Sequence, residues 1–197
     1  MLGVATDQPG PTLQTERLLL RRWRESDRAP FAALNADPEV MRYFRGSLDR
    51  AGSDAFVDRI EKGFDELGYG LWAAEVRARN EFIGFVGLAR QTYEAPFTPA
   101  VEVGWRLART AWGHGYATEA ARVALDFGFT AVGLGEIVSV TTRRNERSQA
   151  VMARLGMTRD PADDFDYPLY PEGHPLRPSV LYRLTRQRWL ERGARGS

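Results

Sequence analysis

Trp112-Gly113-His114-Gly115-Tyr116-Ala117-Thr118-Glu119-Ala120 is the stretch of sequence that decides the fold. It follows a predicted strand at 101–107 and begins a predicted helix at 116–130, in which alanines recur at helical spacing. The first N–H groups of a helix have no intrahelical partner and lie at the positive end of its dipole. Glycines before such a helix let an anion approach the backbone closely. By itself the stretch fits either a structural turn or a phosphate-binding turn. Thr118 stands where the dinucleotide fingerprint needs a third glycine, so this is not that fingerprint.

The residues on either side of this turn predict a mixed α/β (α+β) domain. The predicted strands are 16–23, 69–76, 81–89, 101–107, 136–141 and 180–185, with a hairpin turn at 77–80. The predicted helices are 27–36, 38–44, 53–67, 116–130 and 148–155, and 91–100 and 160–178 are predicted loops. This order favours one curved, mostly antiparallel sheet over a doubly wound parallel sheet. We expect a single domain at 15–190, a flexible tail at 1–14, fraying after Trp189 and a tail at 191–197.

Composition excludes several classes of function. The formal net charge of +1 and the mixed distribution of charges give no reason to expect a nucleic-acid or membrane partner. The absence of cysteine excludes disulfides, thiolate zinc sites and cysteine nucleophiles. No apolar run is long enough to span a bilayer and no signal pattern begins the chain, so we expect a cytoplasmic protein. Two histidines, His114 and His174, and an acidic stretch at 160–166 without the EF-hand glycine predict no metal site.

Residues 106–120 resemble the coenzyme A loop of the GNAT acetyltransferase superfamily, in the branch that contains the ribosomal-protein N-terminal acetyltransferases. The resemblance extends to residues 15–18, 145–156 and 181–185. It implies a GNAT-like fold in which a central pair of strands is splayed, with helices on both faces of the sheet. It also implies that acetyl-CoA is the cofactor. The sequence departs from the family pattern at Thr110, where Gln or Arg is common.

The resemblance implies that the loop, the strand before it and a second segment bind the cofactor. The implied residues are Val103, Trp105, Leu107, Arg109, Thr110, Trp112, Gly113, His114, Gly115, Tyr116, Ala117, Thr118, Asn145 and Ser148. For Asn145, contact with the cofactor and capping of a helix are both open. Gly104, inside a strand, predicts either a bulge or room for a bulky side chain.

Acetyl transfer to an amine needs a base, because a protonated amine cannot attack a carbonyl. Glu102 is the candidate base; the alternative is a charge that faces solvent from an edge strand. A backbone N–H of Val103 or Trp105 is the candidate to polarise the thioester oxygen. Ser148 or Tyr182 is the candidate to protonate the leaving thiolate.

The acceptor is expected to be an amine, either a peptide or protein N-terminus or a small molecule. Trp72, Phe85, Trp105, Tyr167 and Tyr170 are candidates to line its pocket, with ordinary core packing as the alternative. The loops at 91–100 and 160–178 are expected to determine substrate choice. The alternative function is a non-catalytic acyl-CoA sensor, and a nucleic-acid module is disfavoured by the balanced charge. The resemblance also implies a possible homodimer.

Overall fold

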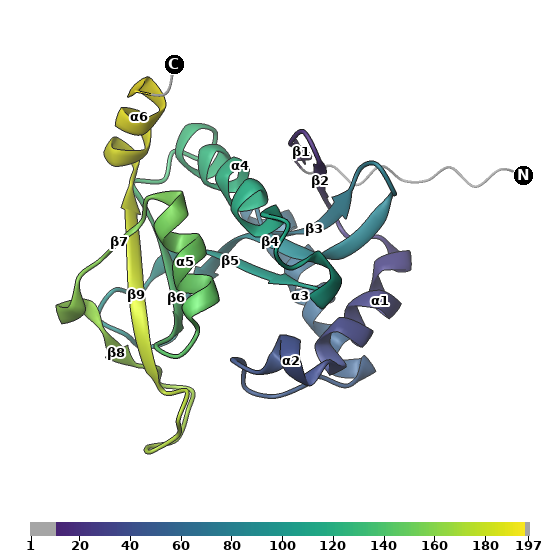
Figure 1. Ribbon diagram of the computed structural model, residues 1–197, viewed down its shortest axis with the longest axis horizontal. Helices are drawn as coiled ribbons and strands as arrows, with labels where there is room; N and C mark the ends of the chain where they lie inside the picture. Colours follow the sequence, from purple (N-terminus) through teal and green to yellow (C-terminus); the bar gives the residue numbers. More distant parts are fainter. Residues whose placement is uncertain (1–10, 196–197) are drawn as a thin grey trace, which may run out of the picture.

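The computed structural model describes residues 11–195, in which a nine-stranded sheet carries helices on both faces (Figure 1). The strands lie in the order β1-β2-β3-β4-β5-β6-β9-β7, and β8 also pairs with β9. Each pair is antiparallel except β5–β6, which is parallel. The strands are β1 (Leu13–Gln14), β2 (Leu18–Arg21), β3 (Leu71–Val76), β4 (Glu81–Gln91), β5 (Ala100–Leu107), β6 (Glu136–Thr142), β7 (Thr158–Arg159), β8 (Phe165–Asp166) and β9 (Pro178–Thr185). The predicted mixed fold with a mostly antiparallel sheet is confirmed.

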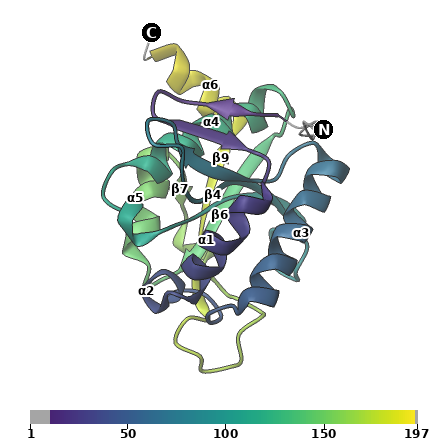
Figure 2. The same cartoon turned by 90° about the vertical axis from the view of Figure 1, so that its right-hand side faces the viewer.

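The α-helices of the described chain are α1 (Glu25–Ala36), α2 (Pro38–Met41), α3 (Arg50–Leu67), α4 (Tyr116–Thr130), α5 (Glu146–Leu155) and α6 (Arg186–Arg195). Figure 1 shows α1–α3 at one end of the molecule and β6–β9 with α5 at the other. In Figure 2, α1 and α3 lie side by side over the sheet, in agreement with their contacts. Within residues 11–195, no helix combines the length and apolar character that a membrane crossing requires.

The two faces of β4 show how the core is divided. Phe85 packs edge-on against Phe31 of α1 and Phe56 of α3, with ring centroids 6.0 and 5.8 Å away. Its strand neighbour Val86 is fully buried and points to the opposite face, because successive side chains alternate along a strand. On that opposite face α4 approaches so closely that a Cβ at Gly128 would lie 2.9 Å from the Leu88 side chain. The predicted helices on both faces are therefore confirmed.

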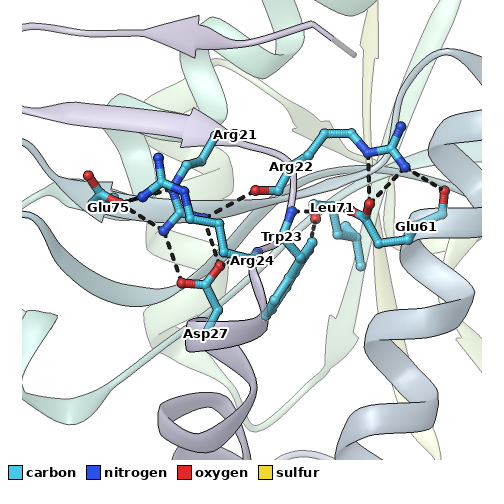
Figure 3. A network of polar contacts seen from close by, with 8 residues as sticks. All are labelled: Arg21, Arg22, Trp23, Arg24, Asp27, Glu61, Leu71 and Glu75. Atoms are coloured by element: carbon cyan, nitrogen blue, oxygen red, sulfur yellow. Dashed lines mark hydrogen bonds and ion pairs between the residues drawn. The ribbon is translucent and has the colours of Figure 1, made fainter. Parts of the chain in front are cut away.

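A buried ion-pair network attaches the start of α1 to the sheet (Figure 3). Arg21 on β2 pairs with Asp27 at 2.6 Å and with Glu75 of β3 at 2.7 Å. The Asp27 carboxylate also accepts a hydrogen bond from the backbone N–H of Arg24, at 2.8 Å. Breaking such a network leaves an uncompensated buried charge, at a cost of about 3–5 kcal/mol. The network fixes the direction of α1, and therefore the position of Asn35 near its other end.

The termini differ from the predicted tails at two points. Leu13 and Gln14 form β1, because an edge strand such as β2 offers unpaired backbone groups to another strand. Helix α6 continues to Arg195, where fraying was expected after Trp189. The Trp189 indole is 6.0 Å from the Phe129 ring and donates a hydrogen bond to Asp126 of α4 at 3.1 Å, so the helix is docked. Residues 1–10 and 196–197 of the predicted tails lie outside the described residues.

Two further local predictions need correction. The register of β4 and β5 is unbroken from Gly84↔Leu107 to Gln91↔Ala100, so the bulge predicted at Gly104 is wrong. The loop predicted at 160–178 contains β8, whose residues pair with the start of β9.

Candidate active site

The parallel strands β5 and β6 are joined by a single ladder pair, Glu102↔Val138. Side chains bridge the strands beside it. The Ser139 hydroxyl donates to the Val103 carbonyl at 2.9 Å, and the Glu102 carboxylate accepts from the Val140 N–H at 3.2 Å. These contacts take the place of further backbone pairs, so the predicted splay of the central strands is confirmed.

The N-terminus of α4 presents uncapped amide groups. Gly115 is the N-cap residue, and within residues 11–195 no side chain caps this end of the helix. Gly113 and Gly115 both have φ of +81°, a left-handed conformation that favours glycine. A Cβ at Gly113 would meet no atom within 4 Å, and one at Gly115 would meet only the Arg17 guanidinium, at 3.6 Å. Amides that face open space at a helix N-terminus suit a phosphate group.

The Glu119 carboxylate lies near this helix end, but an ion pair with Arg17 neutralises its charge. Glu119, in the first turns of α4, accepts hydrogen bonds from Thr15 and from the Arg17 backbone and guanidinium, the last at 2.7 Å. The Arg17 guanidinium also lies 4.8 Å from the centre of the Tyr116 ring. Residues 15–17 therefore hold the Glu119 charge in an ion pair, and it does not oppose an anion at the amides.

A cleft of about 1520 Å³ begins at these amides and extends between α4 and α5. Six arginines line it: Arg42, Arg106, Arg122, Arg144, Arg147 and Arg154. The Arg147 guanidinium lies 4.9 Å from the centre of the Trp112 ring, and Trp189 of α6 also lines the cleft. The volume, the uncapped amides and the guanidinium groups fit a long ligand that carries several phosphates, such as coenzyme A.

A second cavity of about 410 Å³ is lined by Glu102, Gly104 and residues of β6, on the side of the Glu102 carboxylate. Burial desolvates this carboxylate and raises its pKa from 4.5 to about 7, although hydrogen bonds from the Val140 N–H and the Gln91 side chain oppose the shift. A carboxylate with a pKa near 7 is well matched to accept a proton at neutral pH. A Cβ at Gly104 would meet no atom within 4 Å, so this glycine leaves space in the cavity rather than room for a bulky neighbour.

Asn145 and Ser148 line both cavities. The Asn145 side chain caps α5 by accepting from the Ser148 N–H at 3.2 Å. Its amide NH₂ group donates to the Thr141 and Ser148 hydroxyl oxygens, both at 3.0 Å. Because the Ser148 oxygen accepts from Asn145, its own O–H remains available as a donor. Asn145 therefore caps α5, and its contact with the cofactor stays a prediction.

The structure brings together most of the predicted site residues but not all. Those that line the large cleft are Trp105, Leu107, Trp112, Gly113, Gly115, Tyr116, Ala117, Thr118, Asn145 and Ser148. Those that line neither cavity are Val103, Arg109, Thr110, His114 and Tyr182.

Four of the five residues outside the cavities have other surroundings, and Thr110 is exposed. Val103 is fully buried, Arg109 lies 3.9 Å from Asp37, and the His114 ring stacks on Tyr116. Tyr182, on β9, packs against the hydrophobic core.

The aromatic candidates for the acceptor pocket are divided between the cavities and the core. Phe85, Trp105, Tyr167 and Tyr170 line the two cavities, whereas Trp72 is fully buried in the core. The two predicted substrate loops contact each other, and Gln91 and Tyr167 of these loops line the small cavity. Tyr93 lies 4.9 Å from Tyr167, and Phe97 lies 5.0 Å from Phe165, between ring centroids.

Sequence reasoning missed several residues that line the cavities. Arg106 lines both, Gln91 lines the small one, and Arg122 and Trp189 line the large one. The signal for Arg106 was its place two residues after Gly104 and four after Glu102, which puts the three on one face of a strand.

The fold, the splayed strands and the loop before α4 define the class of GNAT-fold acyltransferases. The chain belongs to the GNAT acetyltransferase family, since the model of the acetyltransferase (GNAT) domain matches residues 17–158. The FsC-acetyl coenzyme A-N(2)-transacetylase of Aspergillus fumigatus is 33% identical over 187 residues, which cover 91% of this chain and 78% of that protein.

Solved structures show the same fold. An acetyltransferase from Agrobacterium tumefaciens is 30% identical with a TM-score of 0.71, covering 88% of this chain and 94% of its own. The ribosomal-protein-S5-alanine acetyltransferase from Vibrio fischeri is 20% identical with a TM-score of 0.71, covering 91% and 98%.

Proposed function

We propose that this protein is an N-acetyltransferase that uses acetyl-CoA to acetylate an amine, by direct transfer. One observation carries the proposal: an uncapped helix N-terminus adjoins parted strands where Glu102 and Ser148 both line the same cavity. The helix N-terminus is the proposed place for the phosphates of the coenzyme. The parted strands place the proposed base, Glu102, and the proposed hydroxyl donor, Ser148, at the gap.

The large cleft is the proposed coenzyme site. The amides of residues 113–118 would hold the diphosphate, since glycines at 113 and 115 leave the approach open. Arg122, Arg147 and Arg154 would stabilise the remaining negative charge of the coenzyme. When bound, acetyl-CoA supplies an acetyl thioester, which an unprotonated amine can attack.

Glu102 is the proposed base. Its carboxylate lies in the small cavity, and burial holds its pKa at about 7, so it can accept a proton from the acceptor amine or from an intervening water. The hydrogen bond from the Val140 N–H fixes the carboxylate at the gap between the strands. The alternative of a solvent-facing edge charge is disfavoured by this contact.

Backbone and hydroxyl donors complete the proposed machinery. The Val103 carbonyl faces β6, and backbone groups two residues apart in a strand point the same way, so the Trp105 N–H also faces the gap. It is the proposed donor to the carbonyl oxygen of the acetyl group. The Ser148 O–H is the proposed donor to the leaving thiolate, because Ser148 lines both cavities and Tyr182 lines neither.

A thiol-release assay with acetyl-CoA and a panel of amines tests the function. The panel holds amino acids, short peptides, alkylamines and diamines, with mass detection of the acetylated product. We expect thiol release with at least one member, matched by a mass increase of one acetyl group. Tight binding of coenzyme A without release for any amine would favour the alternative, an acyl-CoA sensor. A cytoplasmic location and a homodimer stay predictions.

A further inference from the structure

Arg106 is a cation at the wall between the two cavities. Its Nη1 donates to the neutral side-chain oxygen of Asn35 at 2.6 Å. Within residues 11–195 the Arg106 side chain has no carboxylate within ion-pair distance. Its Nε is buried and has no hydrogen-bond partner among the described residues. Burial without a counter-ion lowers the pKa of Arg106 to about 10, which still leaves the guanidinium charged at neutral pH.

The surroundings hold this guanidinium rigidly. Its Cζ lies 4.1 Å from the centre of the Phe44 ring and 5.4 and 5.5 Å from those of Phe85 and Phe56. Asn35 is fully buried and donates to the Ser53 hydroxyl at 2.9 Å, so its oxygen is fixed toward Arg106. A buried charge is costly unless it is paired, and the aromatic faces compensate for only part of that cost.

The charged residues that line the small cavity are Glu102, Arg45 and Arg106. The one carboxylate among them is already assigned to accept the proton of the amine. A polycationic acceptor would therefore place its second positive charge near guanidinium groups, with no second carboxylate to receive it. The charge balance of this cavity favours an acceptor that carries one amine and one anionic group.

The geometry of β5 gives such an acceptor its direction. Glu102, Gly104 and Arg106 occupy every second position of β5 and therefore lie on one face of the strand. Gly104 has no side chain to separate the other two. At about 3.3 Å per residue, the Cα atoms of Glu102 and Arg106 are roughly 13 Å apart. The side chains shorten this span, so the amine and the anion of the acceptor must be several bonds apart.

We propose that Arg106 binds a carboxylate of the acceptor while Glu102 receives its amine, so that the natural acceptor is an amine that also carries a carboxylate several bonds away. This inference rests on the proposed function for the role of Glu102. Arg106 is then a specificity-determining residue, and its planar fork of donors suits a carboxylate.

A series of ω-amino acids, H₂N–(CH₂)n–COOH with n from 1 to 7, tests the proposal against the corresponding carboxamides. The acid and the amide of each pair differ in charge but not in length. We expect kcat/KM for the acid to exceed that for its amide by at least about tenfold at the best chain length. Equal or better use of the amides, or preference for diamines of the same length, would overturn the proposal.

Variants identify the residue that reads the carboxylate. Arg106→Gln should remove the preference for acids by raising the acceptor KM more for each acid than for its amide, and Arg106→Lys should restore part of the preference. The control is Arg28→Gln, which removes a 2.7 Å ion pair to Asp58 between α1 and α3 and touches neither cavity. The same loss of preference in Arg28→Gln, or a preference for acids that Arg106→Gln retains, would contradict the assignment.

Calorimetric binding of each acid and amide to the protein with coenzyme A present gives a readout that is independent of turnover. Binding that favours the acid and is lost in Arg106→Gln would support the proposal even if no thiol were released. Binding without thiol release would reject the proposed acetyl transfer but not the role of Arg106. Equal binding of acid and amide would reject the role of Arg106 even if transfer occurred.

Discussion

The Glu102 carboxylate on β5 accepts a hydrogen bond from the backbone N–H of Val140 on β6 at 3.2 Å. A side chain thus takes the place of a backbone partner where the parallel strands separate. The contact holds the carboxylate at the gap, in a cavity whose desolvation raises its pKa to about 7. The hydrogen bond therefore fixes the position of the carboxylate, while desolvation outweighs the opposing effect of that bond on its pKa.

Glu102→Gln should lower kcat by about 100-fold or more, because the amide cannot accept the proton of the amine. Steady-state rates at saturating amine measure this, with calorimetry of coenzyme A binding to show that affinity holds. In the wild-type protein, kcat should rise with pH through an apparent pKa of about 7, as Glu102 loses its proton. A variant with unchanged kcat would remove Glu102 from the mechanism.

The same group should make stability depend on pH. The pKa of Glu102 is higher in the folded protein, at about 7, than its ordinary 4.5, so the folded state binds the proton more tightly. The resulting stabilisation is fully present below pH 4.5 and is lost as pH rises through about 7. Relative to Glu102→Gln, the wild-type protein should lose roughly 2–3 kcal/mol of unfolding free energy over that range.

Urea unfolding of both proteins at pH 4.5 and pH 8.5 measures this difference. A constant difference between the two pH values would show that the Glu102 carboxylate is well solvated in the folded protein.

Gly113→Ala should weaken coenzyme A binding at least about tenfold, because a side chain at φ +81° strains the turn and adds a methyl group beside the amides. Gly133→Ala is the matched control: its φ is +79°, its Cβ would also meet no atom within 4 Å, and it lines neither cavity. Both should lose about 1–2 kcal/mol of stability, and Gly113→Ala alone should lose affinity. Equal affinity in the two variants would argue against the loop as the phosphate site.

Ser148→Ala should reduce kcat about tenfold to a hundredfold, while Tyr182→Phe should stay within about twofold of the wild type. The reason is position, since Ser148 lines both cavities and Tyr182 packs against the core. A thiolate is a fair leaving group, so the loss for Ser148 is at the lower end of acid catalysis. The reverse order of the two effects would transfer the role of proton donor to Tyr182.

The sequence was sufficient for features that local chemistry decides. The turn at Gly113 and Gly115 follows from glycine and an uncapped helix, and the position of Glu102 follows from strand alternation beside it. Contacts between distant segments were not predictable. The docking of α6 through Trp189 depends on Asp126, and the environment of Arg106 depends on Asn35, 71 residues away. The position of Tyr182 was not predictable either. The sequence made it a candidate proton donor, but its packing against the core puts it outside both cavities.

A crystal structure of the protein with coenzyme A tests the central claim most directly. We predict diphosphate oxygens within hydrogen-bond distance, about 2.7–3.2 Å, of the backbone amides of residues 113–118, and the thiol between β5 and β6 beside Ser148. Coenzyme A bound at another face, or amides at the start of α4 that contact protein atoms in place of phosphate, would contradict it.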